Sequence, residues 1–183
     1  MEISQGKILI AQPFLNDGFF KRSVILITEH NEHGSMGFVM NQRMNLRLKD
    51  VIPKLKNMLQ PLFKGGPVGE NQLFFIHRFS EEISNGIPIS DSGWYWGGDF
   101  EEILNLINEG KANFDNLHFY VGYAGWEAGQ LQKEINEKAW FVSDADYGNL
   151  FQEKHEDIWG NELKRMGSNF AVLANFPQDP SLN

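Results

Sequence analysis

Cysteine is absent from this chain of 183 residues. Its absence excludes a disulfide-stabilised scaffold, a thiol nucleophile, an iron–sulfur cluster and any zinc site with cysteine ligands. The longest apolar runs, such as residues 24–27 and 73–76, fall far short of the about 20 residues that a membrane-spanning helix needs. No basic patch followed by a long apolar stretch opens the chain, so we expect no secretory signal. These absences predict a cytoplasmic protein without membrane contacts.

Positive charge is also scarce, because 16 Lys and Arg stand against 24 Asp and Glu and the net charge is −8. This balance argues against a protein that coats nucleic acid. Residues 1–64 nevertheless carry nine Lys and Arg against five Asp and Glu, whereas residues 65–183 carry seven against nineteen. Strand-like segments continue across residue 65, so we expect one domain over residues 1–183 with two electrostatic faces, rather than two subdomains.

Short apolar and β-branched runs predict a protein rich in strands. The runs cover residues 7–11, 23–28, 36–40, 73–77, 87–89, 94–96, 117–123 and 140–142. Residues 23–28 and 36–40 are predicted to form a hairpin across the polar turn 29–34. Helices are predicted over residues 48–59, 129–138 and between residues 155 and 166. Hairpins with scattered helices predict an α+β fold with a mixed or mostly antiparallel sheet.

The strongest helix prediction starts at Asp99. Asp99 and Glu102 have the spacing of a capping box, and apolar residues then recur at i, i+3, i+4 and i+7 from Phe100. Gly110 is placed to end this helix.

No motif for catalysis or for metal binding is present. The chain has no Gly-x-Ser-x-Gly nucleophile elbow, so no catalytic residue is assigned. His30 and His33 stand beside Glu29 and Glu32, but they fall in the predicted hairpin turn without a third ligand. We interpret them as a solvated turn, and we predict no metal and no cofactor.

Two glycine-rich segments are the most distinctive features of the chain. Gly65, Gly66 and Pro67 follow Lys64 without the Lys-Ser/Thr of a P-loop, and they indicate either a tight turn, which we favour, or an anion-binding nest. Residues 122–131 join a predicted strand to a predicted helix through three glycines. We interpret this second segment as a structural turn, with a binding surface as the alternative.

The helix that follows contains acidic residues on one stripe. If it begins near Trp126, then Glu127, Gln130 and Glu134 share a face. Glu134 also precedes Lys138 by four residues, which predicts an ordinary surface ion pair.

A basic segment raises direct DNA binding as an unfavoured alternative. Its cations are Arg43, Arg47, Lys49, Lys54, Lys56 and Lys64, with Asp50 as the single acidic residue among them. A solvated surface is the usual meaning of such a run, and no helix-turn-helix, zinc-finger or RNP signature accompanies it.

Taken together and in order, several segments resemble the AlgH/YqgE family of small bacterial proteins over nearly the whole chain. They are GKILIAQP (6–13), FKRSV (20–24), GFVMN (37–41), GGPV (65–68), GYAGWEAGQLQKEI (122–135), Trp140 and the tail DPSLN (179–183). The resemblance implies a bacterial, cytosolic, single-domain α+β protein with a bifurcated mixed sheet folded into a pseudo-barrel with flanking helices. The family has no agreed catalytic residues, and one branch is labelled a transcriptional regulator.

The leading functional hypothesis is a non-enzymatic binding or regulatory protein whose partner is a small molecule or a protein. The candidate binding residues are Arg22, Asn41, Gly65, Gly66, Pro67, Gly122, Gly125, Trp126, Gln130 and Glu134. The alternative is an enzyme or binding protein for a small anionic metabolite, with Arg22 or His77 in its cleft. His77 ends an apolar run, where a core histidine with satisfied hydrogen bonds is the commoner arrangement.

Overall fold

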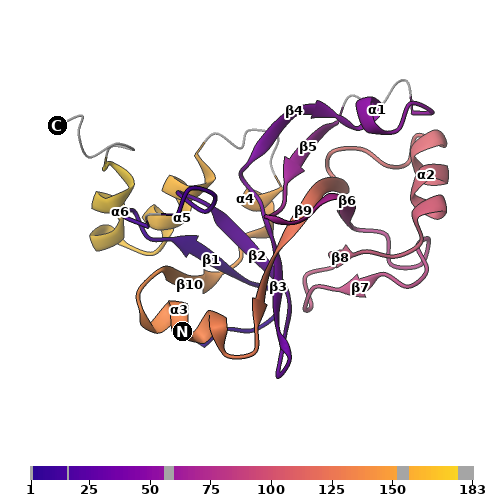
Figure 1. Cartoon of the computed structure of the whole chain (residues 1–183). Helices are drawn as coiled ribbons and strands as arrows, with labels where there is room; N and C mark the ends of the chain where they lie inside the picture. Colours follow the sequence, from indigo (N-terminus) through magenta and orange to yellow (C-terminus); the bar gives the residue numbers. More distant parts are fainter. Residues whose placement is uncertain (1, 16, 56–59, 152–156, 177–183) are drawn as a thin grey trace.

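A computed structural model describes residues 2–15, 17–55, 60–151 and 157–176 (Figure 1). Its strands are β1 (Lys7–Ala11), β2 (Val24–Asn31), β3 (Gly34–Val39), β4 (Arg43–Arg47), β5 (Pro61–Lys64), β6 (Val68–His77), β7 (Ile87–Pro88), β8 (Tyr95–Trp96), β9 (Leu117–Glu127) and β10 (Trp140–Asp144). Its helices are α1 (Leu48–Val51), α2 (Phe100–Asn108), α3 (Gln130–Asn136), α4 (Tyr147–Leu150), α5 (Ile158–Arg165) and α6 (Ser168–Ala174). No helix among these is long and apolar enough to cross a membrane.

All these strands belong to one sheet that branches at β9. The main path runs β10-β1-β2-β3-β9-β6-β8-β7, and β4 and β5 lie off it. The carboxyl-terminal part of β9 pairs with β3, for example Glu127 with Gly34, whereas its amino-terminal part pairs with β6 and β5. Every pairing is antiparallel except β5 with β9, where Leu62 lies opposite Phe119. The predicted α+β class with a mixed, mostly antiparallel, bifurcated sheet is confirmed.

The sheet curls until strands that are distant in its order approach each other. The Gln5 side-chain amide donates one hydrogen bond to the Thr28 carbonyl in β2 (2.8 Å) and one to the Pro88 carbonyl in β7 (2.9 Å). Strands β3, β9, β6 and β8 separate β2 from β7 along the sheet. This amide bridge therefore closes the curled sheet into the expected pseudo-barrel.

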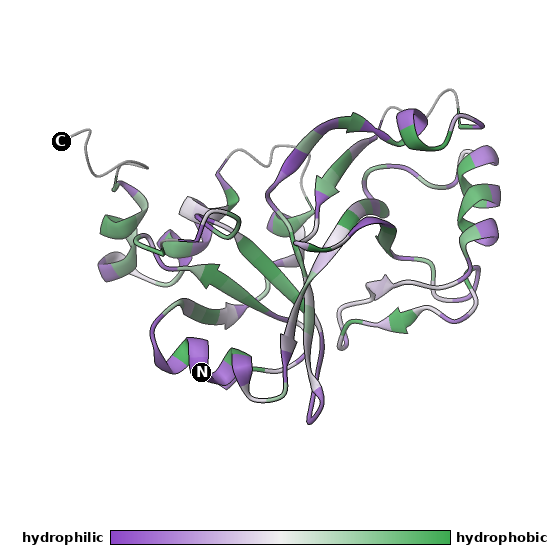
Figure 2. Ribbon diagram, viewed as in Figure 1, coloured by the Kyte–Doolittle hydropathy of each residue, from purple (hydrophilic) through white to green (hydrophobic). Residues whose placement is uncertain are grey.

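The core follows from the alternation of side chains along the strands. In β9, Tyr120 packs with Phe38 and Phe63 on one face, and the adjacent Phe119 packs beneath α2 with Ile103 on the other. Strands β1 and β2 are strongly hydrophobic, and the tip of the β2–β3 hairpin is hydrophilic (Figure 2). Burial on both faces explains the continuous apolar runs that predicted these strands.

Most predicted elements are confirmed, and the differences have local causes. The predicted helix 48–59 ends at Val51, because Pro53 disfavours helical geometry at Ile52, whose ψ is 84°. Strand β9 continues to Glu127, so α3 begins at Gln130 and Trp126 lies in a strand. Helices α4 and α6 and strands β4 and β5 were not predicted. Parts of two predicted helices, at residues 56–59 and 155–156, lie outside the described residues, as does the tail 179–183.

The predicted start of α2 is confirmed at Asp99. The Asp99 carboxylate accepts a hydrogen bond from the Glu102 backbone N–H (3.1 Å). The Glu102 carboxylate does not complete a capping box, because it accepts hydrogen bonds from the backbone N–H (2.6 Å) and the hydroxyl (2.9 Å) of Ser84. Glu102 therefore fastens α2 to the segment that leads into β7.

Candidate functional site

The two glycine-rich segments meet where the sheet branches. A Cβ atom on Gly66 would lie 1.8 Å from the carbonyl carbon of Tyr123, and one on Gly122, which has a φ of +69°, would lie 2.5 Å from the Gly66 oxygen. The Gly65 N–H donates to the Val121 carbonyl (2.8 Å), and is therefore already engaged within the fold. These contacts favour the turn over the anion nest. Pro67 and Gly125 are exposed beside this crossing.

Trp126, Gln130 and Glu134 form a second group that joins α3 to the sheet. One oxygen of the Glu134 carboxylate accepts hydrogen bonds from the indole N–H groups of Trp126 (2.9 Å) and Trp140 (2.8 Å). Its other oxygen accepts from the Gln130 amide (3.0 Å). Lys138 has a φ of +62°, so it has left the helix, and within the described residues it forms no ion pair with Glu134. The predicted Glu134–Lys138 pair is therefore wrong.

Arg22 and Asn41 form a third group. The Asn41 amide donates to the Arg22 carbonyl (2.8 Å) and accepts from the Val24 N–H (2.9 Å), and this clip holds Arg22 at a φ of +54°. The Arg22 guanidinium lies 4.6 Å above the Trp159 ring and donates to the Phe176 carbonyl. Arg22 therefore links the β1–β2 connection to α5 and to the end of α6.

The ten predicted binding residues thus gather in three groups whose contacts lie within the fold. Both ring nitrogens of His77 also have partners within the fold. Its Nε2 lies 3.0 Å from the Gly97 carbonyl, and its Nδ1 accepts a hydrogen bond from the Phe79 N–H (3.2 Å). Burial lowers the pKa of His77, although hydrogen bonds to Gly97 and Phe79 oppose this shift. His77 is a satisfied core histidine.

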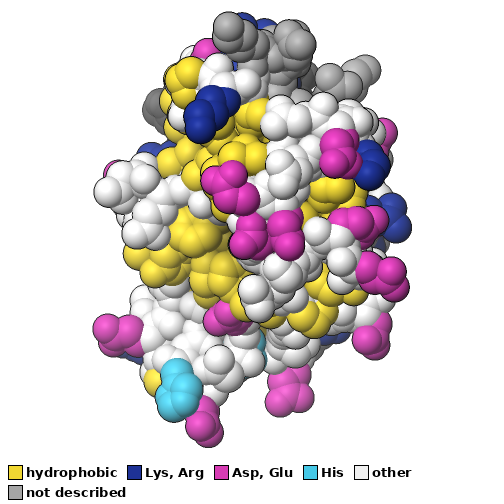
Figure 3. Space-filling model, turned by 90° about the vertical axis from the view of Figure 1, so that its right-hand side faces the viewer, with side chains coloured by type: hydrophobic (Ala, Val, Ile, Leu, Met, Phe, Trp, Pro, Cys, Tyr) yellow, Lys and Arg dark blue, Asp and Glu magenta, His cyan; other side chains and the backbone are white. Residues whose placement is uncertain are grey.

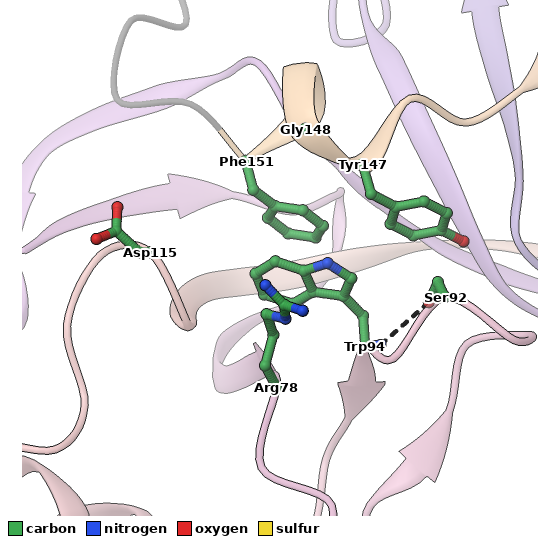
Figure 4. A pocket seen from close by; sticks show the side chains of 7 residues that line it. All are labelled: Arg78, Ser92, Trp94, Asp115, Tyr147, Gly148 and Phe151. Carbon is green, nitrogen blue, oxygen red and sulfur yellow. Dashed lines mark hydrogen bonds between the residues drawn. The ribbon is translucent and has the colours of Figure 1, made fainter.

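A cavity of about 470 Å³ lies apart from these groups (Figure 4). Four separate stretches of chain bring its lining together: the end of β6, the β7–β8 turn, the residues before β9, and α4 with the residue after it. The lining residues are Arg78, Ser92, Trp94, Asp115, Tyr147, Gly148 and Phe151.

Aromatic rings build one wall of this cavity. Trp94 and Phe151 stack with their ring centres 3.8 Å apart, and the ring of Tyr147 lies 6.4 Å from that of Phe151 at a similar inclination. Trp94 and Phe151 are only 5% and 7% exposed, so the surrounding fold holds them in place. The guanidinium carbon of Arg78 lies 5.6 Å from the Trp94 ring centre.

The polar groups of the cavity differ in whether they already have hydrogen-bond or ion-pair partners. Ser92 donates its hydroxyl to the Ile89 carbonyl (2.6 Å) and accepts from the Trp94 N–H (3.1 Å), and this arrangement shapes the turn. The Tyr147 hydroxyl lies 3.3 Å from the Gly6 carbonyl, to which it donates. Arg78 is exposed and pairs with no carboxylate among the described residues, and Asp115 lies across the opening from it (Figure 4). The cavity therefore sets the exposed Arg78, without a carboxylate partner among the described residues, beside aromatic rings that are mostly buried.

A buried carboxylate sets the position of α4. The Asp146 side chain caps α4 by accepting from the Asn149 N–H (3.2 Å). The fully buried Glu162 of α5 accepts from the Asn149 side chain (2.8 Å) and from Arg165 (2.6 Å). Burial raises the pKa of Glu162, although Asn149 and Arg165 oppose this shift. This network keeps α4, and with it the aromatic wall, against α5.

Sequence reasoning missed the cavity, although one signal was visible. Residues 94–96 are the aromatic triplet Trp-Tyr-Trp, directly after the Asp91-Ser92-Gly93 turn. The sequence could not show that Arg78, Asp115 and α4 approach this turn, because their approach depends on long-range pairing.

The basic segment is divided in the structure. Lys64 pairs with Glu70 (3.2 Å) and lies 4.7 Å from the Phe19 ring centre. The other cations that the structure describes lie on β4, in α1 and just beyond it, and Lys56 lies outside the described residues.

The fold defines a class: single-domain α+β proteins built on a bifurcated sheet. The solution structure of the AlgH protein from Pseudomonas aeruginosa has a TM-score of 0.74 to this chain at 29% identity, covering 97% of this chain and 98% of that one. The crystal structure of DIP2367 from Corynebacterium diphtheriae has a TM-score of 0.79 at 24% identity, covering 96% and 94%, and so shares the fold.

The family follows from sequence. The model of the AlgH-like family matches residues 8–171. The UPF0301 protein of Cytophaga hutchinsonii is 41% identical over 182 residues, which cover 99% of this chain and 100% of the relative. That of Bacteroides thetaiotaomicron is 40% identical over 181 residues, covering 98% and 91%. The chain therefore belongs to the AlgH-like family, as the sequence motifs indicated. The names of these bacterial relatives state no activity.

Proposed function

We propose that this chain is a non-enzymatic binding or regulatory protein of the cytoplasm, and that a small, planar, anionic metabolite occupies the cavity beside Trp94. The observation that carries this proposal is the exposed Arg78 guanidinium, which has no carboxylate partner among the described residues, next to a wall of stacked aromatic rings. A guanidinium recognises carboxylate or phosphate oxygens through paired hydrogen bonds, and aromatic faces favour a flat ligand.

The size of the cavity supports a small ligand. A volume of about 470 Å³ lies within the range of known small-molecule sites, about 300–1,000 Å³. The wall is assembled before any ligand arrives, because Trp94 and Phe151 are already buried and stacked. A preformed site loses less conformational entropy on binding.

The engaged hydroxyl groups support binding rather than catalysis. The Ser92 hydroxyl is donated to a backbone carbonyl instead of to a histidine or carboxylate that would activate it as a nucleophile. The Tyr147 hydroxyl is likewise directed at the Gly6 carbonyl. The cavity thus presents shape and charge, and its hydroxyl groups maintain that shape.

Native mass spectrometry after gentle purification from the source, followed by thermal-shift titration with aromatic carboxylates and nucleotides, tests the proposal. Arg78→Gln removes the cation, and Lys111→Gln removes an exposed cation elsewhere as the matched control. We expect a retained or added anion to raise Tm by about 5–10 °C at 100 times its Kd. The rise should vanish in Arg78→Gln and persist in the control.

Three results would overturn the proposal. One is the absence of any retained mass together with the absence of any thermal shift. Another is a shift that Arg78→Gln leaves intact, which would place the ligand elsewhere. The third is turnover of the bound compound, which would make the protein an enzyme.

A further inference from the structure

The β4–α1 corner, which we define as residues 43–51, projects at the upper edge of the molecule (Figure 1). Within the described residues strand β4 pairs with β5 alone, in a register that sets Arg43 opposite Phe63 and Arg47 opposite Pro61. Four steps along β4 thus match two steps along β5, so β4 bulges outward. The bulge borders a hollow of about 300 Å³, lined by Pro61 and by every residue of β4.

The basic side chains of this corner have no acidic partners in the part of the chain that the structure describes. Arg43, Arg47 and Lys49 form no ion pair with any described residue, in contrast to Lys64 at the far end of β5. The one nearby carboxylate in the sequence, Asp50, accepts a hydrogen bond from the Arg47 backbone N–H (2.8 Å) and so caps α1. The corner is therefore a local excess of positive charge on a chain whose net charge is −8.

Two large aliphatic side chains of the same corner are exposed as well. Leu46 is 41% exposed and Val51 is 44% exposed, and both are unusually open for large aliphatic residues. On the right-hand side of the molecule, acidic side chains are spread over the middle and lower parts, and near the top a basic side chain lies beside apolar ones (Figure 3). The combination of cations with exposed aliphatic groups distinguishes the corner from a simple solvated face.

We propose that the β4–α1 corner binds a segment of a protein partner that carries both acidic and aliphatic side chains. Carboxylates of that segment pair with Arg43 and Arg47, and its aliphatic side chains cover Leu46 and Val51. Charge complementarity favours an acidic partner, and the exposed aliphatic groups favour a protein over a nucleic acid. This surface is independent of the cavity beside Trp94.

A nucleic acid fits the same corner less well. Its phosphates would pair with the arginines but would leave Leu46 and Val51 uncovered. Among the residues of the corner there is no aromatic ring on which a base could stack. The net negative charge of the whole chain also opposes a long polyanion.

Fluorescence anisotropy with three labelled probes tests the proposal. The probes are a peptide of glutamate and leucine, the same peptide with serine in place of leucine, and an oligothymidylate of equal charge. We expect the glutamate–leucine peptide to bind most tightly. Arg43→Gln combined with Arg47→Gln should weaken its binding about two- to thirtyfold, as expected for two exposed charge pairs.

Two further variants make the result specific. Leu46→Ser combined with Val51→Ser should reduce binding of the glutamate–leucine peptide to that of the serine peptide. Lys111→Gln combined with Lys133→Gln removes the same charge from other exposed positions and should change binding less than about twofold. All substituted side chains are exposed, and circular dichroism confirms the fold of each variant.

Any of three outcomes overturns the proposal. The first is no saturable binding of the glutamate–leucine peptide at about 50 mM salt, where charge attraction is still strong. The second is unchanged binding when Arg43 and Arg47 are replaced. The third is tighter binding of the oligothymidylate, which would assign the corner to nucleic acid.

Discussion

Replacing Glu134 by alanine removes the acceptor of three side-chain hydrogen bonds at once. The carboxylate receives the indole N–H groups of Trp126 and Trp140 on one oxygen and the Gln130 amide on the other. Trp126 is 7% exposed and Trp140 is 4% exposed, so water cannot freely replace the lost acceptor. The variant therefore leaves two indole donors buried without partners.

The expected loss of stability follows from those two donors. A buried donor without an acceptor costs about 1–3 kcal/mol, so two of them cost about 2–6 kcal/mol in the free energy of unfolding. For a chain of this length each kcal/mol lowers Tm by about 2–4 °C, which predicts a fall of about 4–24 °C. Glu134→Gln keeps one acceptor oxygen and should lose about 1–2 kcal/mol.

Urea unfolding followed by tryptophan fluorescence measures this difference, since both indoles report on the site. Glu137→Ala is the matched control, because Glu137 follows the same helix, is exposed, and lies 3.9 Å from Lys133 in a surface ion pair. The control should change stability by less than about 0.5 kcal/mol. A Glu134→Ala variant no less stable than this control would refute the structural role of the carboxylate. That result would favour the alternative that the segment around Trp126 is a binding surface.

Three further predictions rest on single positions. Gly66→Ala should abolish native circular dichroism because its Cβ would lie 1.8 Å from the Tyr123 carbonyl carbon, whereas Gly110→Ala, with a φ of +72° and open space, should cost about 1–2 kcal/mol and still fold. Burial raises the pKa of Glu162, so its protonation in the native state stabilises the fold as pH falls from 7 towards 4.5. Urea titrations should therefore show the wild type gaining stability relative to Glu162→Gln over that range, and a constant difference would contradict this. Burial lowers the pKa of His77, so the unfolded chain alone takes up this proton below about pH 6.5. The wild type should then lose stability relative to His77→Gln as pH falls below that value, and a parallel pH profile of the two proteins would show that His77 titrates normally.

Most strands of the sheet were predictable because each is specified by its own residues, but β4 and β5 were not predicted. β1 has the predicted bounds, and β2, β3 and β10 lie within a few residues of theirs, since each contains a short apolar run that is typical of a strand. The start of α2 was predictable for a similar reason, because its cap lies within one turn of sequence at Asp99. The branched, closed shape of the sheet was expected from the family resemblance alone.

The candidate sites were predictable only in part. The sequence singled out the motif that contains Trp126 and Glu134, but the contacts of this motif depend on Trp140, which no helical spacing connects to it. The sequence showed the basic segment as one run. Only the structure separated Lys64, which pairs with Glu70, from the β4–α1 corner, whose cations have no acidic partner among the described residues.

The sequence by itself determined the α+β class, most strands, the cap of α2 and membership in the AlgH-like family, because these depend on local patterns or on ordered motifs. Only the tertiary structure decided that Gly66 crosses Gly122, that Glu134 holds two indoles, and that Arg78 approaches Trp94 and Phe151. Those contacts join residues from distant parts of the chain. They exist only once the strands have paired and the sheet has curled, and no spacing along the sequence records that closure.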